Sequence, residues 1–232
     1  MTTNTTERVA LVTGGSAGLG LALSRELARR GWRVITDGRS EEKFKEAGLP
    51  GTVTVVVGDL TDADHRDRLQ AEVERHGRLD LLVHNASTLG PLPMRPLGEV
   101  DVADLMQVWR TNVGGPLVLT SALLPWLRDA DGVLLSISSD AAVQHYETWG
   151  LYGASKAALD HVTLTYAAET GLRAYAVDPG DMRTAMHQDA FPGEDISDRP
   201  LPETVVPHLL ALVEARPEPG RYRAADLGGD RS

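Results

Sequence analysis

The sequence has no cysteine among its 232 residues. This absence excludes disulfide frameworks, thiolate zinc sites, iron–sulfur clusters and cysteine nucleophiles. The seven histidines show no paired metal-ligand spacing and no H-E-x-x-H motif, so we expect no catalytic metal. The chemistry of this chain must therefore be built on hydroxyl, carboxyl, amide and amine side chains.

Positive charge and long apolar runs are also scarce. Asp and Glu outnumber Lys and Arg by 33 to 23, which leaves a net charge of -10. Such a field repels polyanions, so we expect neither nucleic acid nor a membrane surface as a partner. No apolar run reaches the roughly 18 residues of a membrane helix. The polar N-terminus lacks the basic and apolar regions of a secretory signal, and we expect a cytoplasmic protein.

Short apolar runs alternate with stretches of helical period, which indicates a parallel sheet covered by helices on both faces. The predicted strands are 9–12, 33–36, 53–57, 79–84, 133–137, 172–177 and, more weakly, 222–226. The predicted helices are 19–30, 63–76, 100–109, 113–128, 152–170 and 203–215. The sequence therefore predicts one α/β domain over residues 1–232, a doubly wound parallel seven-stranded sheet of the Rossmann type.

A glycine-rich turn, Thr13–Gly20, follows the first predicted strand and opens the first predicted helix. Gly14 permits a tight turn, Gly18 permits close approach of the backbone to a phosphate, and Gly20 permits close packing of helix on strand. Backbone N–H groups at the helix start, with the Ser16 hydroxyl, are suited to hold a pyrophosphate. In this strand–turn–helix context the turn predicts dinucleotide binding.

A second group of polar residues predicts proton transfer. Tyr152 and Lys156 are four residues apart in a predicted helix, so their side chains share one face. A fixed ammonium beside the tyrosine is expected to lower the pKa of its hydroxyl from about 10. Ser139 ends the fifth predicted strand, with Ser136 and Ser138 as nearby alternatives, and is placed to donate to a carbonyl oxygen.

These motifs together resemble the single-domain short-chain dehydrogenases/reductases. The spacing T-G-x-x-x-G-x-G, the segment Asn85-Ala86 after the fourth strand and the run Pro179–Thr184 all match family elements, although His84 and Ser87 depart from the N-N-A-G pattern. The resemblance implies a catalytic tetrad of Asn112, Ser139, Tyr152 and Lys156, in which Asn112 supports a water relay to the lysine. The cofactor-binding residues it implies, together with the glycine turn, are Gly14, Ser16, Gly18, Leu19, Gly20, Arg39, Asp59, Leu60, Asn85, Ala86, Tyr152, Lys156, Pro179, Gly180, Met182 and Thr184.

The end of the second strand bears on which dinucleotide binds. NAD-type relatives carry an acidic residue at the position of Gly38, where it would repel a 2′-phosphate. The next residue, Arg39, has a guanidinium suited to that phosphate. The sequence thus favours NADP(H) over NAD(H). Asp37 is the alternative acidic residue if the alignment is shifted by one residue. The alternative interpretation of Arg39 is a solvated charge on a surface loop that binds no phosphate.

Two irregular segments, 88–98 and 181–202, follow predicted strands and should reach the carboxyl edge of the sheet. We expect 181–202 to form a substrate-side loop or lid. Candidate substrate residues are His145, Tyr146, Trp149 and Met186. Asp140 follows the catalytic serine; it is expected to be a solvated acid turned away, with steering of a cationic substrate as the alternative.

The most favoured function is hydride transfer between NADP(H) and a small carbonyl or alcohol substrate, in particular reduction of an apolar or aromatic ketone or aldehyde. A non-catalytic NADP-binding regulator and a non-redox isomerase or lyase on the same scaffold are the alternatives. The resemblance also implies a homodimer or homotetramer.

Overall fold

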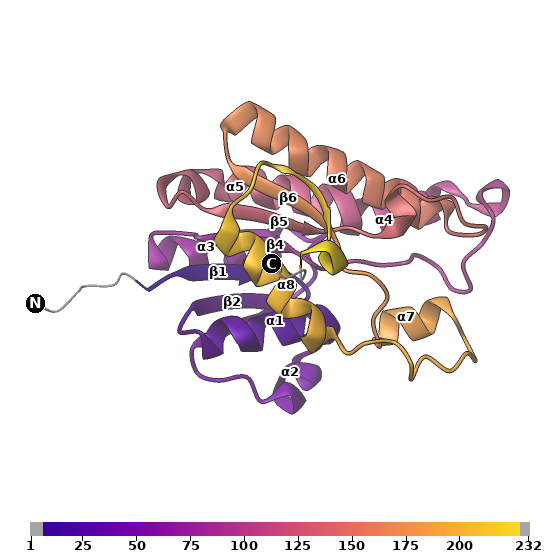
Figure 1. The fold of residues 1–232 in the computed structure, drawn as a ribbon, viewed down its shortest axis with the longest axis horizontal. Coiled ribbons are helices and arrows are strands. Elements are labelled where there is room, and N and C mark those ends of the chain that lie inside the picture. Colours follow the sequence, from indigo (N-terminus) through magenta and orange to yellow (C-terminus); the bar gives the residue numbers. More distant parts are fainter. Residues whose placement is uncertain (1–6, 228–232) are drawn as a thin grey trace, which may run out of the picture.

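The computed structural model describes residues 7–227 and contains one parallel sheet (Figure 1). Its strands, in the order β3-β2-β1-β4-β5-β6-β7, reverse direction of winding between β1 and β4. The doubly wound α/β fold predicted from the sequence is therefore confirmed. The strands are β1 (Val9–Val12), β2 (Arg33–Gly38), β3 (Val53–Val57), β4 (Leu81–His84), β5 (Val133–Ile137), β6 (Arg173–Asp178) and β7 (Gly220–Arg223).

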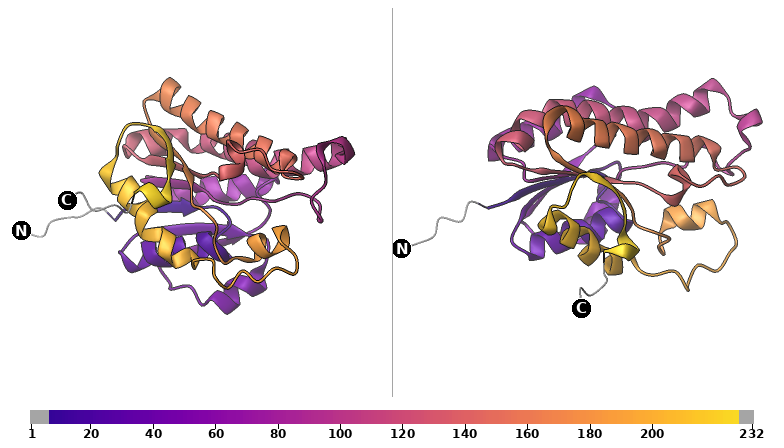
Figure 2. Two further views of the ribbon diagram at one scale, coloured as in Figure 1. Left: turned by 45° about the vertical axis from the view of Figure 1, so that its right-hand side comes forward. Right: turned by 45° about the horizontal axis from the view of Figure 1, so that its top comes forward.

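Helices cover both faces of the sheet, as the edge-on view shows (Figure 2, right). One layer is formed by α1 (Gly18–Arg29) and α8 (Pro202–Ala215), which pack on each other. The opposite layer contains α3 (Ala63–His76), α4 (Val102–Trp109), α5 (Gly115–Asp129) and α6 (Gly150–Thr170). Two shorter helices, α2 (Glu41–Ala47) and α7 (Ala185–Ala190), lie in connections between strands and helices. No helix among residues 7–227 is apolar enough over a sufficient length to cross a membrane.

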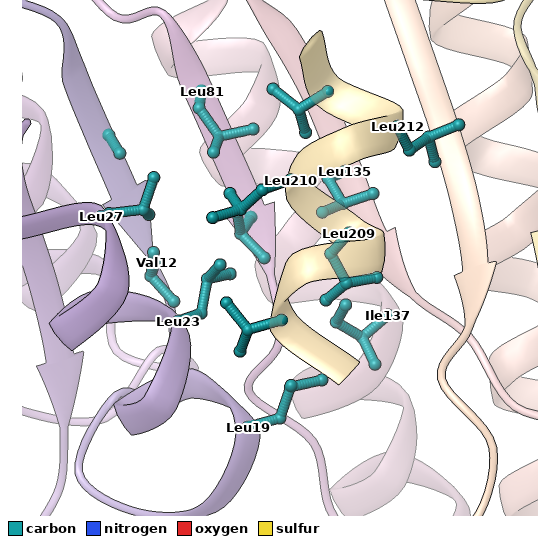
Figure 3. Close-up of a cluster of buried hydrophobic side chains, with 14 of the residues drawn as sticks. Val12, Leu19, Leu23, Leu27, Leu81, Leu135, Ile137, Leu209, Leu210 and Leu212 are labelled. Atoms are coloured by element: carbon teal, nitrogen blue, oxygen red, sulfur yellow. The ribbon is translucent and has the colours of Figure 1, made fainter. Parts of the chain in front are cut away.

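Alternate residues of the central strands supply the two halves of the core. Val12, Leu81 and Leu135 are fully buried against α1 and α8, in the cluster that Figure 3 shows. Leu11 and Leu82 belong to the cluster on the other face, with leucines of α3 and α5. Because strands are buried on both faces, every residue of β1, β4 and β5 is apolar or internally hydrogen-bonded. This explains why continuous apolar runs identified them.

The last strand, Gly220–Arg223, begins two residues and ends three residues earlier than predicted, and Ala224–Asp226 forms a 3₁₀ turn. Its only partner is β6, with Asp178 opposite Arg223. Because β6 ends at Asp178, before Pro179, residues after Arg223 have no neighbouring strand with which to pair. The position of this sheet edge is thus set by the neighbouring strand, which the local pattern did not reveal.

Helices α2 and α7 were missed because each is short. Ser40 caps α2 by accepting from the Lys43 amide at 3.2 Å, and Gly48 closes it in the left-handed region at φ 56°. In the sequence, these two capping residues are the features that could have predicted α2. The predicted helix pair 100–109 and 113–128 is one bent unit, joined by a π-helical turn at Arg110–Gly114.

Candidate active site

A cavity of about 400 Å³ lies along the carboxyl ends of the strands. It begins between the glycine turn and the end of β2 and continues past α6 to α7. This is the edge at which open α/β sheets bind ligands. The predicted site residues that line it are Gly14, Ser16, Gly18, Leu19, Arg39, Asp59, Leu60, Asn85, Ala86, Ser139, Trp149, Tyr152, Lys156, Pro179, Gly180, Met182, Thr184 and Met186.

The glycine turn is held in place by the strand beside it. Gly14 has φ +71°, and a Cβ there would lie 2.8 Å from the Ala86 Cα atom. The Asn85 side-chain amide donates to the carbonyls of Thr13 at 2.9 Å and Gly14 at 3.1 Å. At Gly20 a Cβ would lie 2.4 Å from the Gly14 oxygen. Gly20 therefore packs beneath the turn and does not line the cavity.

The start of α1 is suited to a phosphate group. Its N-cap residue, Ala17, has no side chain that accepts from the first amides of the helix. These N–H groups therefore need another acceptor, and a phosphate at the positive end of the helix dipole supplies one. A Cβ at Gly18 would meet only the Thr184 side chain, at 3.4 Å. The turn and the Pro179–Thr184 segment thus face each other with backbone exposed between them, which fits a dinucleotide.

Asp37 lies in the protein interior, with 2% of its surface exposed. One carboxylate oxygen accepts from the Gly14 amide at 2.7 Å and the other contacts the His65 Nε2 atom at 2.9 Å. One oxygen thus holds the glycine turn, and the other is bound to His65 of α3. Arg39 is exposed at the same end of the cavity, and Lys43 of α2 also lines it. Lys43 was missed in the sequence because α2 was not predicted.

Lys156 is buried one helical turn after Tyr152 in α6. Its Nζ atom donates to the Ile137 carbonyl at 2.8 Å and lies 5.6 Å from the centre of the Tyr152 ring. Burial lowers the pKa of the ammonium to about 8, against an opposing contribution from Asp160. The amine is therefore largely charged at neutral pH, and it is fixed to the end of β5.

The Tyr152 hydroxyl does not have the lowered pKa expected from the sequence. Burial raises its pKa well above the ordinary value, and hydrogen bonding with the Ser139 and Ser87 hydroxyls only partly opposes this. Burial of the hydroxyl is the largest effect on its pKa, and the negative charges of Asp140 and Asp178 add to it. Tyr152 is therefore a protonated phenol at neutral pH, which is the form that donates a proton.

Of the three serines at the end of β5, only Ser139 presents its hydroxyl to this region. The Ser138 hydroxyl donates to Asp160 at 2.8 Å, and the Ser136 hydroxyl accepts from Thr163 at 2.7 Å. The Ser139 hydroxyl donates to the Asp140 carboxylate at 3.0 Å and accepts from the Ala141 amide at 3.2 Å. Asp140 is thus hydrogen-bonded to the serine, contrary to the expectation of an acid turned away.

Asn112 is fully buried in the π-helical turn and lies outside the cavity lining. Its side chain donates to the Thr88 carbonyl and to the Ser155 hydroxyl, each at 2.9 Å, and accepts from the Thr88 amide at 2.9 Å. Asn112 therefore ties the loop after β4 to the helix that carries Tyr152 and Lys156. The water relay expected of it stays a prediction.

The substrate end of the cavity is aromatic. Trp149 packs against Tyr152 at 5.8 Å and against Phe191, which follows α7, at 5.7 Å between ring centres. Two predicted substrate residues are not part of the lining: His145 is exposed, and Tyr146 donates its hydroxyl to Asp140 at 2.7 Å. Within residues 7–227 no three His, Asp or Glu side chains gather as a metal site would require.

Comparison with known proteins agrees with this arrangement. A family profile described as short chain dehydrogenase matches residues 8–195. The uncharacterized oxidoreductase YciK of Escherichia coli K12 is 34% identical over 220 residues, covering 89% of this chain and 86% of that protein.

Two solved structures share the fold closely. A short chain dehydrogenase from Shigella flexneri complexed with NADP has a TM-score of 0.86 and 32% identity, covering 94% of this chain and 97% of that one. One from Escherichia coli CFT073 complexed with NADPH has a TM-score of 0.86 and 33% identity, covering 94% and 96%. The protein is a member of the short-chain dehydrogenase/reductase family, an NAD(P)-dependent oxidoreductase acting on CH–OH groups.

Proposed function

We propose that the protein is an NADP(H)-dependent oxidoreductase that reduces an apolar or aromatic ketone or aldehyde, or oxidises the corresponding alcohol. The observation that carries this proposal is one continuous cavity with a basic end and a proton-donating end. Arg39 and Lys43 line the first, beside Asp59 and beside Asp37, whose carboxylate is bound to the Gly14 amide and to His65, and Tyr152 with Ser139 lines the second. The NADP and NADPH bound to related structures support the same cofactor here.

The residues at the two ends have distinct tasks. Arg39 and Lys43 would pair with a 2′-phosphate, and the first amides of α1 with the pyrophosphate. The cofactor supplies the hydride; the protein supplies position and electrostatics. In reduction, the protonated Tyr152 hydroxyl gives its proton to the carbonyl oxygen as that oxygen gains charge. Lys156 holds a positive charge beside the ring and stabilises the tyrosinate that remains.

The proposed assembly and loop functions rest on separate features. We propose one catalytic domain for the whole chain and a lid formed by 181–202, which includes α7 and projects from the rest of the molecule (Figure 1). Met182, Met186 and His187 of this segment line the cavity. A homodimer or homotetramer is supported by exposed apolar side chains on α4 and α5: Val102, Leu105, Met106, Leu117 and Val118. Gly153 of α6 is not available to a partner subunit, because it already packs on Ala141. A cytoplasmic location stays a prediction.

The test is NADPH consumption with a panel of ketones, aldehydes and quinones, run in parallel with NADH. We expect turnover of at least one aryl ketone or aldehyde, with a higher kcat/KM for NADPH than for NADH. Turnover with NADH alone would contradict the assignment of Arg39 and Lys43. Binding of NADPH with no turnover of any carbonyl, or of any alcohol with NADP⁺, would contradict the enzymatic proposal.

A further inference from the structure

Asp140 occupies an unusual electrostatic position beside the proposed reaction centre. It directly follows Ser139, is exposed, and lines the cavity. One carboxylate oxygen accepts from the Ser139 hydroxyl at 3.0 Å and the Ala141 amide at 2.8 Å. The other accepts from the Tyr146 hydroxyl at 2.7 Å. Three donors therefore hold a carboxylate one hydrogen bond away from the catalytic serine.

This arrangement works against the reaction of a neutral carbonyl compound. The Ser139 hydroxyl has a single proton, and in this structure it points to Asp140. The same proton is then not available for the substrate oxygen. A negative charge near that oxygen also opposes the negative charge that develops on it in the transition state.

The other two acids at this end of the cavity have cationic partners, and Asp140 has none. Asp178 lies 3.7 Å from Arg221, and Asp181 lies 3.7 Å from Arg199. Among residues 7–227, no Lys, Arg or His nitrogen lies within 4 Å of the Asp140 carboxylate. The carboxylate has three donors and room for about one more, since two oxygens offer about four acceptor positions. A cation in the cavity could therefore reach this carboxylate without displacing a positive side chain.

We propose that the substrate carries an ammonium group one carbon away from the reacting carbon, and that Asp140 binds this group. The inference rests on the proposed function and narrows its substrate class to amino alcohols and amino ketones. The ammonium neutralises the charge beside the reacting oxygen and takes the acceptor position that Ser139 occupies, so that the serine proton turns to the substrate. An apolar or aryl group of the same substrate packs against Trp149 and Met186, which line the same cavity.

In the oxidation direction the reaction balances as follows. Tyr152 first loses its proton to solvent; the carbinol carbon then loses its hydride to NADP⁺ while its hydroxyl proton passes to the tyrosinate oxygen, so a ketone, NADPH and one solvent proton are formed. The ammonium group takes no part in bond making. Asp140 is thus a specificity-determining residue, which acts on the charge of the substrate and leaves the chemistry of the reacting carbon unchanged.

The test compares two alcohols of the same shape. In 2-amino-1-phenylethanol an ammonium stands where 1-phenyl-1-propanol has a methyl group. We expect wild-type kcat/KM with NADP⁺ to be higher for the amine by at least about tenfold, or about 1.4 kcal/mol. In Asp140→Asn, which keeps an acceptor for the Ala141 amide, we expect this preference to disappear and the rate with the neutral alcohol to rise.

Two controls separate the possible outcomes. Asp181→Asn removes another acid from the same lining and should leave the amine preference intact, so an equal loss there would overturn the assignment to Asp140. Binding of 2-phenylethylamine in the presence of NADP⁺, measured by calorimetry, should weaken at least about tenfold in Asp140→Asn. Equal wild-type rates with the two alcohols would overturn the inference alone. No turnover of any alcohol or carbonyl would overturn the proposed function and the inference with it.

Discussion

The two ends of the cavity are constructed from different parts of the chain. At the cofactor end, buried side chains hydrogen-bond to backbone: Asp37 to the Gly14 amide, and Asn85 to the carbonyls of Thr13 and Gly14. At the substrate end the contacts are between side chains that are at least partly exposed: Asp140 accepts from the Tyr146 hydroxyl, and Trp149 packs against Phe191. The first end presents a rigid backbone surface to a common ligand, while the second is defined by individual side chains that set selectivity.

The largest expected effect separates chemistry from binding. Tyr152→Phe removes the proton donor, so kcat should fall about a thousandfold, whereas the affinity for NADPH should stay within about twofold because the ring remains. Stopped-flow turnover and fluorescence titration of NADPH measure the two quantities. Tyr166→Phe, farther along the same helix α6, is the control and should leave both unchanged. Retention of more than a tenth of kcat in Tyr152→Phe would remove Tyr152 from this role.

A change in the backbone should affect the cofactor end more than any side-chain change there. In Gly14→Ala the new Cβ would lie 2.8 Å from the Ala86 Cα at a positive φ of +71°. The turn must then shift, and we expect NADPH affinity to fall by a hundredfold or so. Gly31→Ala is the matched control, since its φ of +81° carries the same strain with nothing within 4 Å. It should cost about 1 kcal/mol of unfolding free energy and leave binding intact; equal binding losses would contradict this account.

The basic residues at the cofactor end should affect one dinucleotide only. Arg39→Ala with Lys43→Ala removes two charged partners of a 2′-phosphate, and because both side chains are exposed each contributes about 1 kcal/mol or less. We expect Kd for NADPH to rise about tenfold and Kd for NADH to remain unchanged. Lys45→Ala, on the same helix α2 but paired with Glu41, is the control. A parallel loss of both cofactors would show that these residues do not read the phosphate.

The remaining prediction concerns the stability of the fold, not catalysis or cofactor binding. His84 is buried at the end of β4, and burial, aided by the charge of Lys156, lowers its pKa to about 3. The unfolded chain takes up this proton near pH 6.5, so folding stability falls as the pH decreases from about 6.5 to about 3. His84→Asn should flatten the decline of Tm in this range, whereas His76→Asn, at the exposed end of α3, should not. An unchanged slope in His84→Asn would contradict the pKa.

The accuracy of the predictions from the sequence differs between the cofactor end and the substrate end of the cavity. The glycine turn and the Tyr152–Lys156 pair could be predicted, because short spacings report directly on a turn or on one face of a helix. The burial of Asp37 depends on a contact with His65, 28 residues away, which no local pattern records. Lys43 reaches the cavity only through the short helix α2.

At the substrate end, less of the arrangement could be predicted from the sequence. The sequence placed Asp140 next to the catalytic serine and Tyr146 nearby, but the direction of each side chain comes from the turn at Asp140–Ala142 and the start of α6. Similarly, the position of the Lys156 ammonium, 5.6 Å from the centre of the Tyr152 ring, depends on its hydrogen bond to the Ile137 carbonyl. Residue spacing thus did not predict the directions of these side chains, and those directions determine selectivity.

The most direct test of the central claim follows a deuterium atom. NADPH labelled at the reactive C4 position of the nicotinamide is incubated with the protein and an aryl ketone that it consumes, and the alcohol is analysed by mass spectrometry. The account predicts one deuterium on the carbinol carbon with wild-type protein and almost no product with Tyr152→Phe. Product without deuterium, or equal product from Tyr152→Phe, would contradict hydride transfer assisted by this tyrosine.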